Sequence, residues 1–135
     1  MRYLILLLLI IFPICSIADW IVKPKIIRNY DGDTITAEVQ VFPSVFVKGD
    51  FRVAGVDTPE IRGGCVESKI LATRAKKFTE DALKGDVSFR VLEETTYGRW
   101  IAVVYIGKDR LDDLLIKSGL GRAMGNKEKR KSWCN

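Results

Sequence analysis

The sequence has 135 residues, with no histidine and only three cysteines. The lack of histidine excludes catalytic triads or dyads with an imidazole base, and metal sites built on histidine ligands. Three cysteines are too few for a closed four-cysteine zinc site. Catalysis would therefore have to use carboxylates, lysines, arginines, hydroxyl groups or a hard cation held by oxygen ligands. The formal net charge of +5 weakly favours an anionic partner such as nucleic acid.

Residues 1–18 have the pattern of a secretory signal peptide. Arg2 precedes a long apolar run, and the small residues Ser16 and Ala18 occupy the positions expected before a cleavage site. Cleavage there leaves one domain, residues 19–135, and changes the charge from +5 to +4 by removing Arg2. An uncleaved anchor is the alternative, but Asp19 ends the run before the roughly 20 residues of a membrane span. We expect a secreted or periplasmic monomer without stable membrane association.

Cleavage would also remove Cys15 and leave Cys65 and Cys134. In an exported protein, two cysteines are most simply explained by a disulfide bond, since these bonds form in oxidising compartments. Two unpaired thiols are the alternative. A bond between Cys65 and Cys134 would join the end of the chain to its middle.

Alternation of apolar and polar residues predicts several strands. The clearest pattern covers Thr34–Val41, directly after the turn signal Asp31-Gly32. A second turn is expected at Lys48-Gly49-Asp50, between two apolar stretches. The remaining expected strands are Val45–Val47, Phe51–Val56, Val87–Val91 and Ile101–Tyr105.

Two helices are expected in the second half of the chain. The longer one ends near Gly85, and a short one carrying Leu111, Leu114 and Leu115 ends at Gly119. The longer helix is predicted to bury one apolar stripe, made of Val66, Ile70, Ala75, Phe78, Ala82 and Leu83. The pattern predicts an α+β protein, and it is compatible with a small closed barrel or another α+β arrangement.

Three short clusters carry the residues suited to chemistry. Asp33 begins a strand beside a tight turn, although solvated turn carboxylates are a sufficient explanation for this segment alone. Arg52 lies in an apolar run and Asp57 and Glu60 follow it, so that an ion pair is as good an explanation as a functional one. Arg99 stands in a turn where an arginine is usually solvated.

Together these clusters would suffice for phosphodiester hydrolysis. Asp33, Asp57 and the carbonyl of Thr58 are oxygen ligands of the kind that Ca²⁺ takes. The two arginines of these clusters, Arg52 and Arg99, can each bind a phosphate through two hydrogen bonds. Glu60 can orient or deprotonate a water molecule.

The order of these motifs closely resembles the thermonuclease family of staphylococcal-nuclease-like domains, in the branch exported by bacteria. The motifs are Asp31-Gly32-Asp33-Thr34, Phe51-Arg52, Val56-Asp57-Thr58-Pro59-Glu60, Tyr97-Gly98-Arg99 and Ser118-Gly119-Leu120. The resemblance implies a five-stranded OB-fold barrel with two to three helices packed on it. It also implies Ca²⁺-dependent cleavage of DNA and RNA that leaves 3′-phosphate ends.

The resemblance also implies a role for each matched residue. It makes Asp33, Asp57 and the Thr58 carbonyl the Ca²⁺ ligands, and Glu60 the residue that acts on the attacking water. It makes Arg52 and Arg99 the pair that binds the phosphate, and Tyr97 a contact to the phosphate of the bound nucleotide. The segments around Cys65 and Cys134 resemble those of the exported branch, which supports their pairing.

The sequence departs from the family pattern at two places. Thr96 stands where a lysine often precedes the Tyr-Gly-Arg turn, and Ala123, Met124 and Gly125 occupy the region where tyrosines stack on the nucleotide. Base stacking contributes about 1–3 kcal/mol per base, so substrate affinity or preference is expected to differ. The alternative function is a binding module that has the same fold but little or no catalytic activity. The basic tail around Lys127–Lys131 adds phosphate contacts or is simply solvated.

Overall fold

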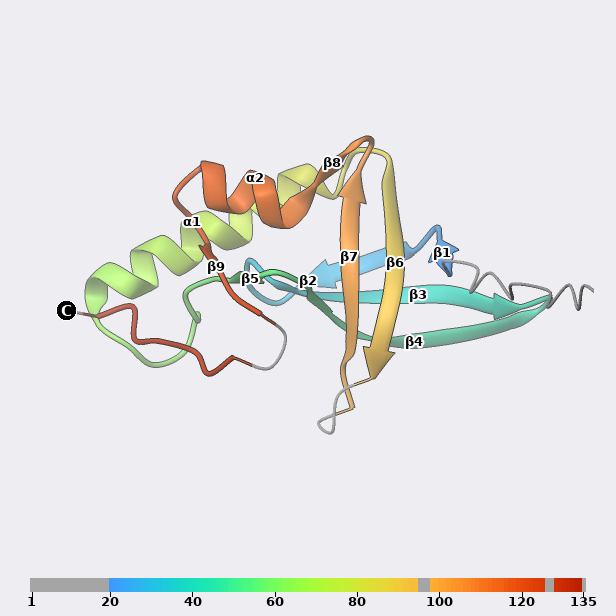
Figure 1. Ribbon diagram of the computed structural model, residues 1–135, viewed down its shortest axis with the longest axis horizontal. Coiled ribbons are helices and arrows are strands. Elements are labelled where there is room, and N and C mark those ends of the chain that lie inside the picture. Colours follow the sequence, from blue (N-terminus) through green and yellow to red (C-terminus); the bar gives the residue numbers. More distant parts are fainter. Residues whose placement is uncertain (1–19, 95–97, 126–127, 135) are drawn as a thin grey trace, which may run out of the picture.

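The computed structural model describes residues 20–94, 98–125 and 128–134 of the chain. This part contains a seven-stranded sheet, a separate two-stranded sheet and two helices (Figure 1). The protein is therefore α+β and mainly β, as the sequence pattern predicted. The expected signal peptide, residues 1–18, lies outside the described residues.

The larger sheet is built on five strands of five or more residues. These are β2 (Lys25–Asn29), β3 (Thr34–Phe42), β4 (Val45–Val53), β6 (Val87–Glu94) and β7 (Trp100–Ile106). Two short strands, β1 (Ile21–Val22) and β8 (Asp109–Arg110), bring the total to seven.

Hydrogen bonds connect the strands in the order β1-β6-β7-β4-β3-β2, with β8 beside β7. The pairing of β4 with β7 is parallel and the other pairings are antiparallel. In Figure 1, β6 and β7 run across the direction of β3 and β4. The two ends of this path, β1 and β2, are consecutive in the chain and are separated only by Lys23 and Pro24.

The turn expected at Lys48-Gly49-Asp50 is wrong, because these residues lie inside the continuous strand β4. Gly49 pairs with Ala37 across β3, and the hydroxyl of Thr36 donates to Asp50 Oδ1 at 2.6 Å. A Cβ atom on Gly49 would lie 3.4 Å from the ring of Trp100, which is an ordinary contact distance. The chain reverses instead between β3 and β4, where Ser44 has a φ of 64°.

The two helices are α1 (Val66–Ala82) and α2 (Leu111–Lys117), close to their expected bounds. The apolar stripe predicted for α1 is wrong at its start, since Val66 and Ile70 are exposed. The buried residues of α1 are small or hydroxyl-bearing, Ser68, Ala72, Ala75 and Thr79. Phe78, Ala82 and Leu83 of the predicted stripe do pack in or against the core. Small side chains let the helix approach closely, and the buried hydroxyl groups of Ser68 and Thr79 each find a hydrogen-bond acceptor.

The hydrophobic core lies between the curved sheet and the helices. Phe51 from β4 and Phe89 from β6 pack with ring centroids 5.1 Å apart, and Ile35 from β3 is fully buried beside them in the same cluster. Leu111 and Leu115 of α2 complete this core. The helices lie together on one side of the molecule, whereas the β3–β4 hairpin extends away from them (Figure 1).

The small sheet brings the C-terminal segment to the strand that carries Asp57. It consists of β5 (Val56–Asp57) and β9 (Arg122–Ala123), and Asp57 is paired with Arg122. Gly121 precedes β9, and a Cβ atom there would lie only 2.5 Å from Val56 Cγ2, so the close approach requires glycine.

A disulfide bond fixes the end of this segment. Cys65 and Cys134 are bonded with their Cα atoms 5.8 Å apart, as the pair of cysteines predicted. The C-terminal tail, residues 122–134, is therefore attached at one end to β5 and at the other to the residue that precedes α1. Neither helix in the described ranges is long and apolar enough to cross a membrane.

Candidate active site

Two acidic motifs form the site: the first is Asp31-Gly32-Asp33-Thr34, and the second is Val56-Asp57-Thr58-Pro59-Glu60. The loop that carries the first acidic motif is held in place by α1. The side chain of Asn29 donates hydrogen bonds to the carbonyls of Asp31, at 3.0 Å, and of Lys76, at 2.9 Å. The hydroxyl of Thr79 donates to the carbonyl of Gly32 at 2.7 Å. The contacts with Lys76 and Thr79 each connect residues 47 positions apart in the sequence, so helix packing sets the position of the loop.

Gly32 allows the loop to lie against both the helix and the second acidic motif. A Cβ atom at this position would lie 2.8 Å from Thr58 Cγ2 and 2.9 Å from the Cβ atom of Ala75. Since these distances are shorter than a normal carbon–carbon contact, only glycine fits between the two segments. The first and second acidic motifs are thereby brought side by side.

Asp33 is fully buried at the start of β3, and each of its carboxylate oxygens accepts a hydrogen bond. Oδ1 accepts from Arg52 Nη1 at 3.0 Å, and Oδ2 accepts from the backbone N–H of Thr58 at 2.8 Å. The register of the sheet explains the first contact, because Thr34 is paired with Arg52. Asp33 thus joins the end of β4 to the segment after β5.

Arg52 forms the ion pair that its apolar surroundings suggested. Its side chain is only 12% exposed, and besides Asp33 it contacts the carbonyl of Val56 at 3.2 Å and Asp57 Oδ1 at 3.6 Å. A charged group so deeply placed needs such partners to offset its loss of hydration. In this structure the guanidinium of Arg52 is thus bound to the carboxylates.

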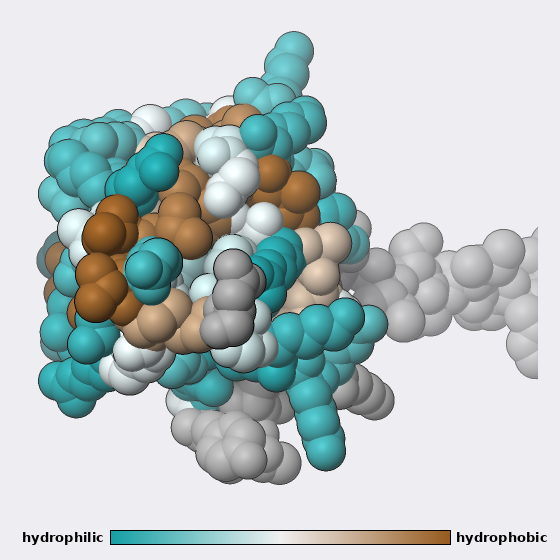
Figure 2. All heavy atoms as spheres, turned by 90° about the vertical axis from the view of Figure 1, so that its left-hand side faces the viewer, coloured by the Kyte–Doolittle hydropathy of each residue, from teal (hydrophilic) through white to brown (hydrophobic). Residues whose placement is uncertain are grey.

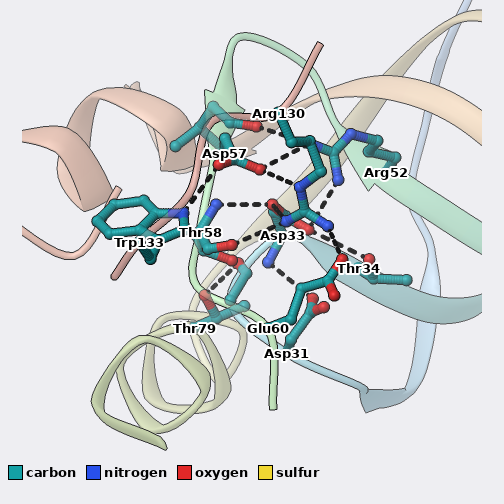
Figure 3. Close-up of polar contacts among 12 residues, drawn as sticks. Asp31, Asp33, Thr34, Arg52, Asp57, Thr58, Glu60, Thr79, Arg130 and Trp133 are labelled. Atoms are coloured by element: carbon teal, nitrogen blue, oxygen red, sulfur yellow. Dashed lines mark hydrogen bonds and ion pairs between the residues drawn. The ribbon is translucent and has the colours of Figure 1, made fainter. Parts of the chain in front are cut away.

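Arg130 of the C-terminal tail has its guanidinium among the oxygens predicted to bind Ca²⁺ (Figure 3). Nη2 donates to the carbonyl of Thr58 at 2.8 Å and lies 3.5 Å from Asp33 Oδ2. Nε donates to Asp57 Oδ1, and Nη1 donates to Glu60 Oε1. Four residues from the first and second acidic motifs therefore converge on one cationic group.

Trp133 and Arg122 hold the tail close to this group. The indole N–H of Trp133 donates to Asp57 Oδ2 at 2.9 Å. The guanidinium of Arg122 stacks on the ring of Trp133 at 3.7 Å from its centroid, and donates to the carbonyl of Ser132 at 2.8 Å. Asp57 thus accepts hydrogen bonds from two tail residues at once.

The electrostatics of the site follow from this crowding of charge. Burial acts to lower the pKa of Arg130, but the negative charges of Asp33, Asp57 and Glu60 and the hydrogen bond to Asp57 raise it above its ordinary value. Burial and the charge of Asp33 raise the pKa of Asp31 to about 6. Asp31 Oδ1 accepts the backbone N–H of Asp33 at 3.1 Å, so Asp31 shapes the loop.

A cleft of about 540 Å³ adjoins these carboxylates. Glu60 and Arg130 lie on its wall, and Arg99 lines it together with Arg28 and Arg62. The side chain of Glu60 is 59% exposed, in contrast to the buried Asp33. The site therefore has a buried carboxylate floor beside an open, arginine-lined cleft.

The oxygens around Arg130 have the chemistry that a hard cation requires. Asp33 and Asp57 are buried carboxylates, and both contact Arg130, as does the carbonyl of Thr58. Within the described ranges, no three aspartate, glutamate or cysteine side chains form a ready-made metal site. Two carboxylates and one main-chain carbonyl are an oxygen-only donor set of the kind that Ca²⁺ takes.

Comparison with known proteins shows the family to which the chain belongs. The family model described as "Staphylococcal nuclease homologue" matches residues 50–133. The chain belongs to this family. A thermonuclease of Staphylococcus hyicus is 33% identical over 102 residues, which is 73% of this chain and 57% of that protein. The chain therefore spans somewhat more than half the length of this relative.

The range matched by the family model contains much of the site but not all of it. Asp57, Thr58, Glu60 and Arg99 lie within residues 50–133, as does Arg130, whereas Asp33 precedes this range. The structure itself brings Asp33 to the others through Arg52 and the backbone of Thr58.

The structure places most of the predicted site residues together. Asp33, Arg52, Asp57, Thr58 and Glu60 form one cluster, and Arg99 lines the adjoining cleft. The predicted substrate contact Tyr97 lies outside the described residues.

Two residues of the site were not identified from the sequence. Arg130 was assigned only to a basic tail, and Trp133 was not singled out. The nearby Cys134 was the available signal, because a disulfide bond to Cys65 forces the preceding residues to lie beside the second acidic motif.

Proposed function

We propose that this protein is a calcium-dependent nuclease that hydrolyses phosphodiester bonds of DNA and RNA and leaves 3′-phosphate ends. One observation carries the proposal. Two buried carboxylates and the carbonyl of Thr58 converge on a single cationic group at the wall of a cleft that Arg99 lines. Membership of the staphylococcal nuclease family supports it.

In the proposed mechanism Asp33, Asp57 and the Thr58 carbonyl hold the metal ion. Bound there, Ca²⁺ would stabilise the negative charge that develops on the phosphate in the transition state. Glu60, exposed at the cleft, orients or deprotonates the attacking water. Arg99 binds the phosphate through its planar guanidinium. Arg52 orients Asp33 through the ion pair between them. In the proposed mechanism Arg52 also contacts the substrate phosphate.

We infer that the protein is exported after cleavage behind Ala18. The bond between Cys65 and Cys134 supports this, since disulfide bonds persist in oxidising compartments. Mass spectrometry of the protein from the periplasm or the culture medium should find Asp19 as the first residue. A protein that keeps Arg2 and fractionates with membranes would show that the segment is an anchor.

We also infer that the larger sheet closes into the OB-fold barrel of the family. β1 pairs with β6 and β2 pairs with β3, so the short connection through Pro24 joins the two ends of the sheet. Proline lacks a backbone N–H and interrupts the ladder at this point. In a closed barrel, nuclear Overhauser contacts are expected between backbone protons of β2 and β6. If these contacts are absent, the sheet is open and this inference is wrong.

Cleavage of single-stranded DNA and of RNA by the purified, oxidised protein tests the activity. We expect cleavage with millimolar Ca²⁺, none with a chelator, and products whose ends lose phosphate on treatment with a 3′-phosphatase. Arg99→Ala should lower kcat about 10²- to 10³-fold, as loss of a transition-state donor does. Arg74→Ala is the matched control, because Arg74 is exposed on α1.

A second pair of variants tests the role of the Glu60 carboxylate in catalysis. Glu60→Gln should lower kcat by about 10²-fold or more, while Glu80→Gln, exposed near the end of α1, should leave it unchanged. Undiminished cleavage in Arg99→Ala would contradict the mechanism. Binding of DNA without cleavage in the presence of Ca²⁺ would favour the alternative, a binding module of the same fold.

A further inference from the structure

The C-terminal tail supplies its own cation to the proposed metal site. We propose that Arg130 is an internal competitor of Ca²⁺, so that the tail sets the Ca²⁺ concentration at which the site fills. This inference depends on the proposed function, since it takes Asp33, Asp57 and the Thr58 carbonyl as the metal ligands. It adds a regulatory role for a residue of the tail.

Arg130 and a metal ion would require the same oxygen atoms. The guanidinium contacts Asp33 Oδ2, Asp57 Oδ1 and the carbonyl of Thr58. Ca²⁺ binds oxygens at about 2.3–2.6 Å, which leaves no space for a guanidinium nitrogen on the same side of these atoms. Two positive groups so close also repel each other strongly, because little water lies between them to screen the charges. Occupation by one therefore excludes the other.

The chain segments before and after Arg130 both hold it at the site. Upstream, β9 pairs with β5, and Arg122 stacks on Trp133. Downstream, Trp133 donates to Asp57, and Cys134 is bonded to Cys65. A tethered group has a high effective concentration and competes far better than a free one.

The contacts of Arg130 differ from those of its basic neighbours. Lys129 and Lys131 are exposed, and both line a small pocket beside Arg122. Arg130 has a side chain 33% exposed, and within the described residues it is the one of these three that forms ion pairs with the site carboxylates. Figure 2 shows the face of the molecule that carries the tail, where hydrophilic side chains surround hydrophobic ones. The sequence Lys129-Arg130-Lys131 is thus not a uniform basic patch.

Calorimetric titration of the oxidised protein with Ca²⁺, without substrate, tests the competition. Arg130→Ala should lower the dissociation constant for Ca²⁺ about tenfold or more, because the site is no longer partly occupied. Lys129→Ala and Lys131→Ala change the net charge by the same amount and should alter this constant less than twofold. They therefore control for the general effect of a lost positive charge.

The outcomes separate this inference from the proposed function. Tighter binding in Arg130→Ala but not in the two lysine variants supports the competition. Equal or weaker binding in Arg130→Ala overturns it and leaves the Ca²⁺ site in place. Absence of Ca²⁺ binding in both the wild-type protein and Arg130→Ala overturns the calcium role and this inference together.

The wild-type protein provides a second test that does not depend on folding of a variant. Phenylglyoxal modifies accessible guanidinium groups, and mass spectrometry of the tail peptide reports the modification of Arg130. Addition of Ca²⁺ should increase this modification severalfold, because the ion displaces the side chain from Asp57 and Glu60. Modification that does not change, while calorimetry shows Ca²⁺ bound, overturns the inference.

The tether is tested by a double-mutant cycle with Cys134→Ser. If the disulfide bond keeps Arg130 at the site, Cys134→Ser tightens Ca²⁺ binding in the wild-type background and has no such effect in Arg130→Ala. An equal effect in both backgrounds contradicts a role of the tether in the competition.

Discussion

Arg52 and Asp33 form a buried ion pair in which Nη1 of the guanidinium lies 3.0 Å from Oδ1 of the carboxylate. Asp33 is fully buried, and the neighbouring Thr34 is paired directly with Arg52 in the sheet. The pair therefore joins β3 to the end of β4 at the floor of the site. Because both charges have left bulk water, each depends on the other to offset the loss of hydration.

Arg52→Met should lower the free energy of unfolding by about 3 kcal/mol or more, because Asp33 would lose its main charged partner. Urea denaturation in the presence of a chelator measures this value without a contribution from bound metal. Arg74→Met, at an exposed position of α1, should change stability by about 0.5 kcal/mol or less. A loss below about 1 kcal/mol in Arg52→Met would show that the pair contributes little.

Thr79→Val should destabilise the protein by about 1–3 kcal/mol, since it leaves the carbonyl of Gly32 without the hydroxyl at 2.7 Å. The site loop should also become less ordered, and its amide hydrogens should exchange faster. Thr73→Val is the control in the same helix, because the exposed hydroxyl of Thr73 contacts only the carbonyl of Lys69. Similar losses of stability in both variants would mean that the hydrogen bond from Thr79 to the loop does not stabilise the protein more than the exposed bond of Thr73 does.

Gly32→Ala should destabilise the protein by about 1–3 kcal/mol through overpacking, because the added Cβ atom meets Thr58 and Ala75 at 2.8–2.9 Å. Gly49→Ala is the matched control, since its Cβ atom would meet the Trp100 ring at 3.4 Å, an ordinary contact. Thermal unfolding of both variants compares them directly. Equal melting temperatures would contradict the close packing around the loop.

Loss of the disulfide bond should destabilise the protein by about 4 kcal/mol on the chain-entropy model, because the bond closes a loop between residues 69 positions apart. The double variant Cys65→Ser/Cys134→Ser, compared with oxidised wild-type protein by chemical denaturation, gives this value. Reduced wild-type protein should match the double variant. A much smaller loss in both would show that the tail stays in place without the bond.

Several elements could be predicted from the sequence because local pattern decides them. The alternation in Thr34–Val41 predicted β3, which extends one residue further, to Phe42. Gly85 predicted a helix end, and α1 ends shortly before it, at Ala82. The ion pair of Arg52 was weighed as one alternative from its apolar neighbours, and the structure confirms it. The pairing of Cys65 with Cys134 was predicted from the expected loss of Cys15 with the signal peptide, and the structure contains this bond.

Other features could not be predicted, because they depend on contacts between distant segments. The sequence around Gly49 predicted a turn, but Gly49 pairs with Ala37 across the sheet and lies inside β4. Val66 and Ile70 fitted an apolar stripe, yet α1 buries its smaller side chains. The reason is the close approach of the helix to the loop at Gly32.

The sequence by itself determined which chemistry was available: oxygen ligands, arginines and one disulfide bond, with no histidine to provide an alternative. It also determined the family, through the order of the acidic motifs and Arg99. Only the tertiary structure decided that Arg130 reaches Asp57, 73 positions away. The physical reason is that strand pairing at β9 and the bond to Cys65 fix both ends of the tail, so its central arginine is held beside the buried carboxylates.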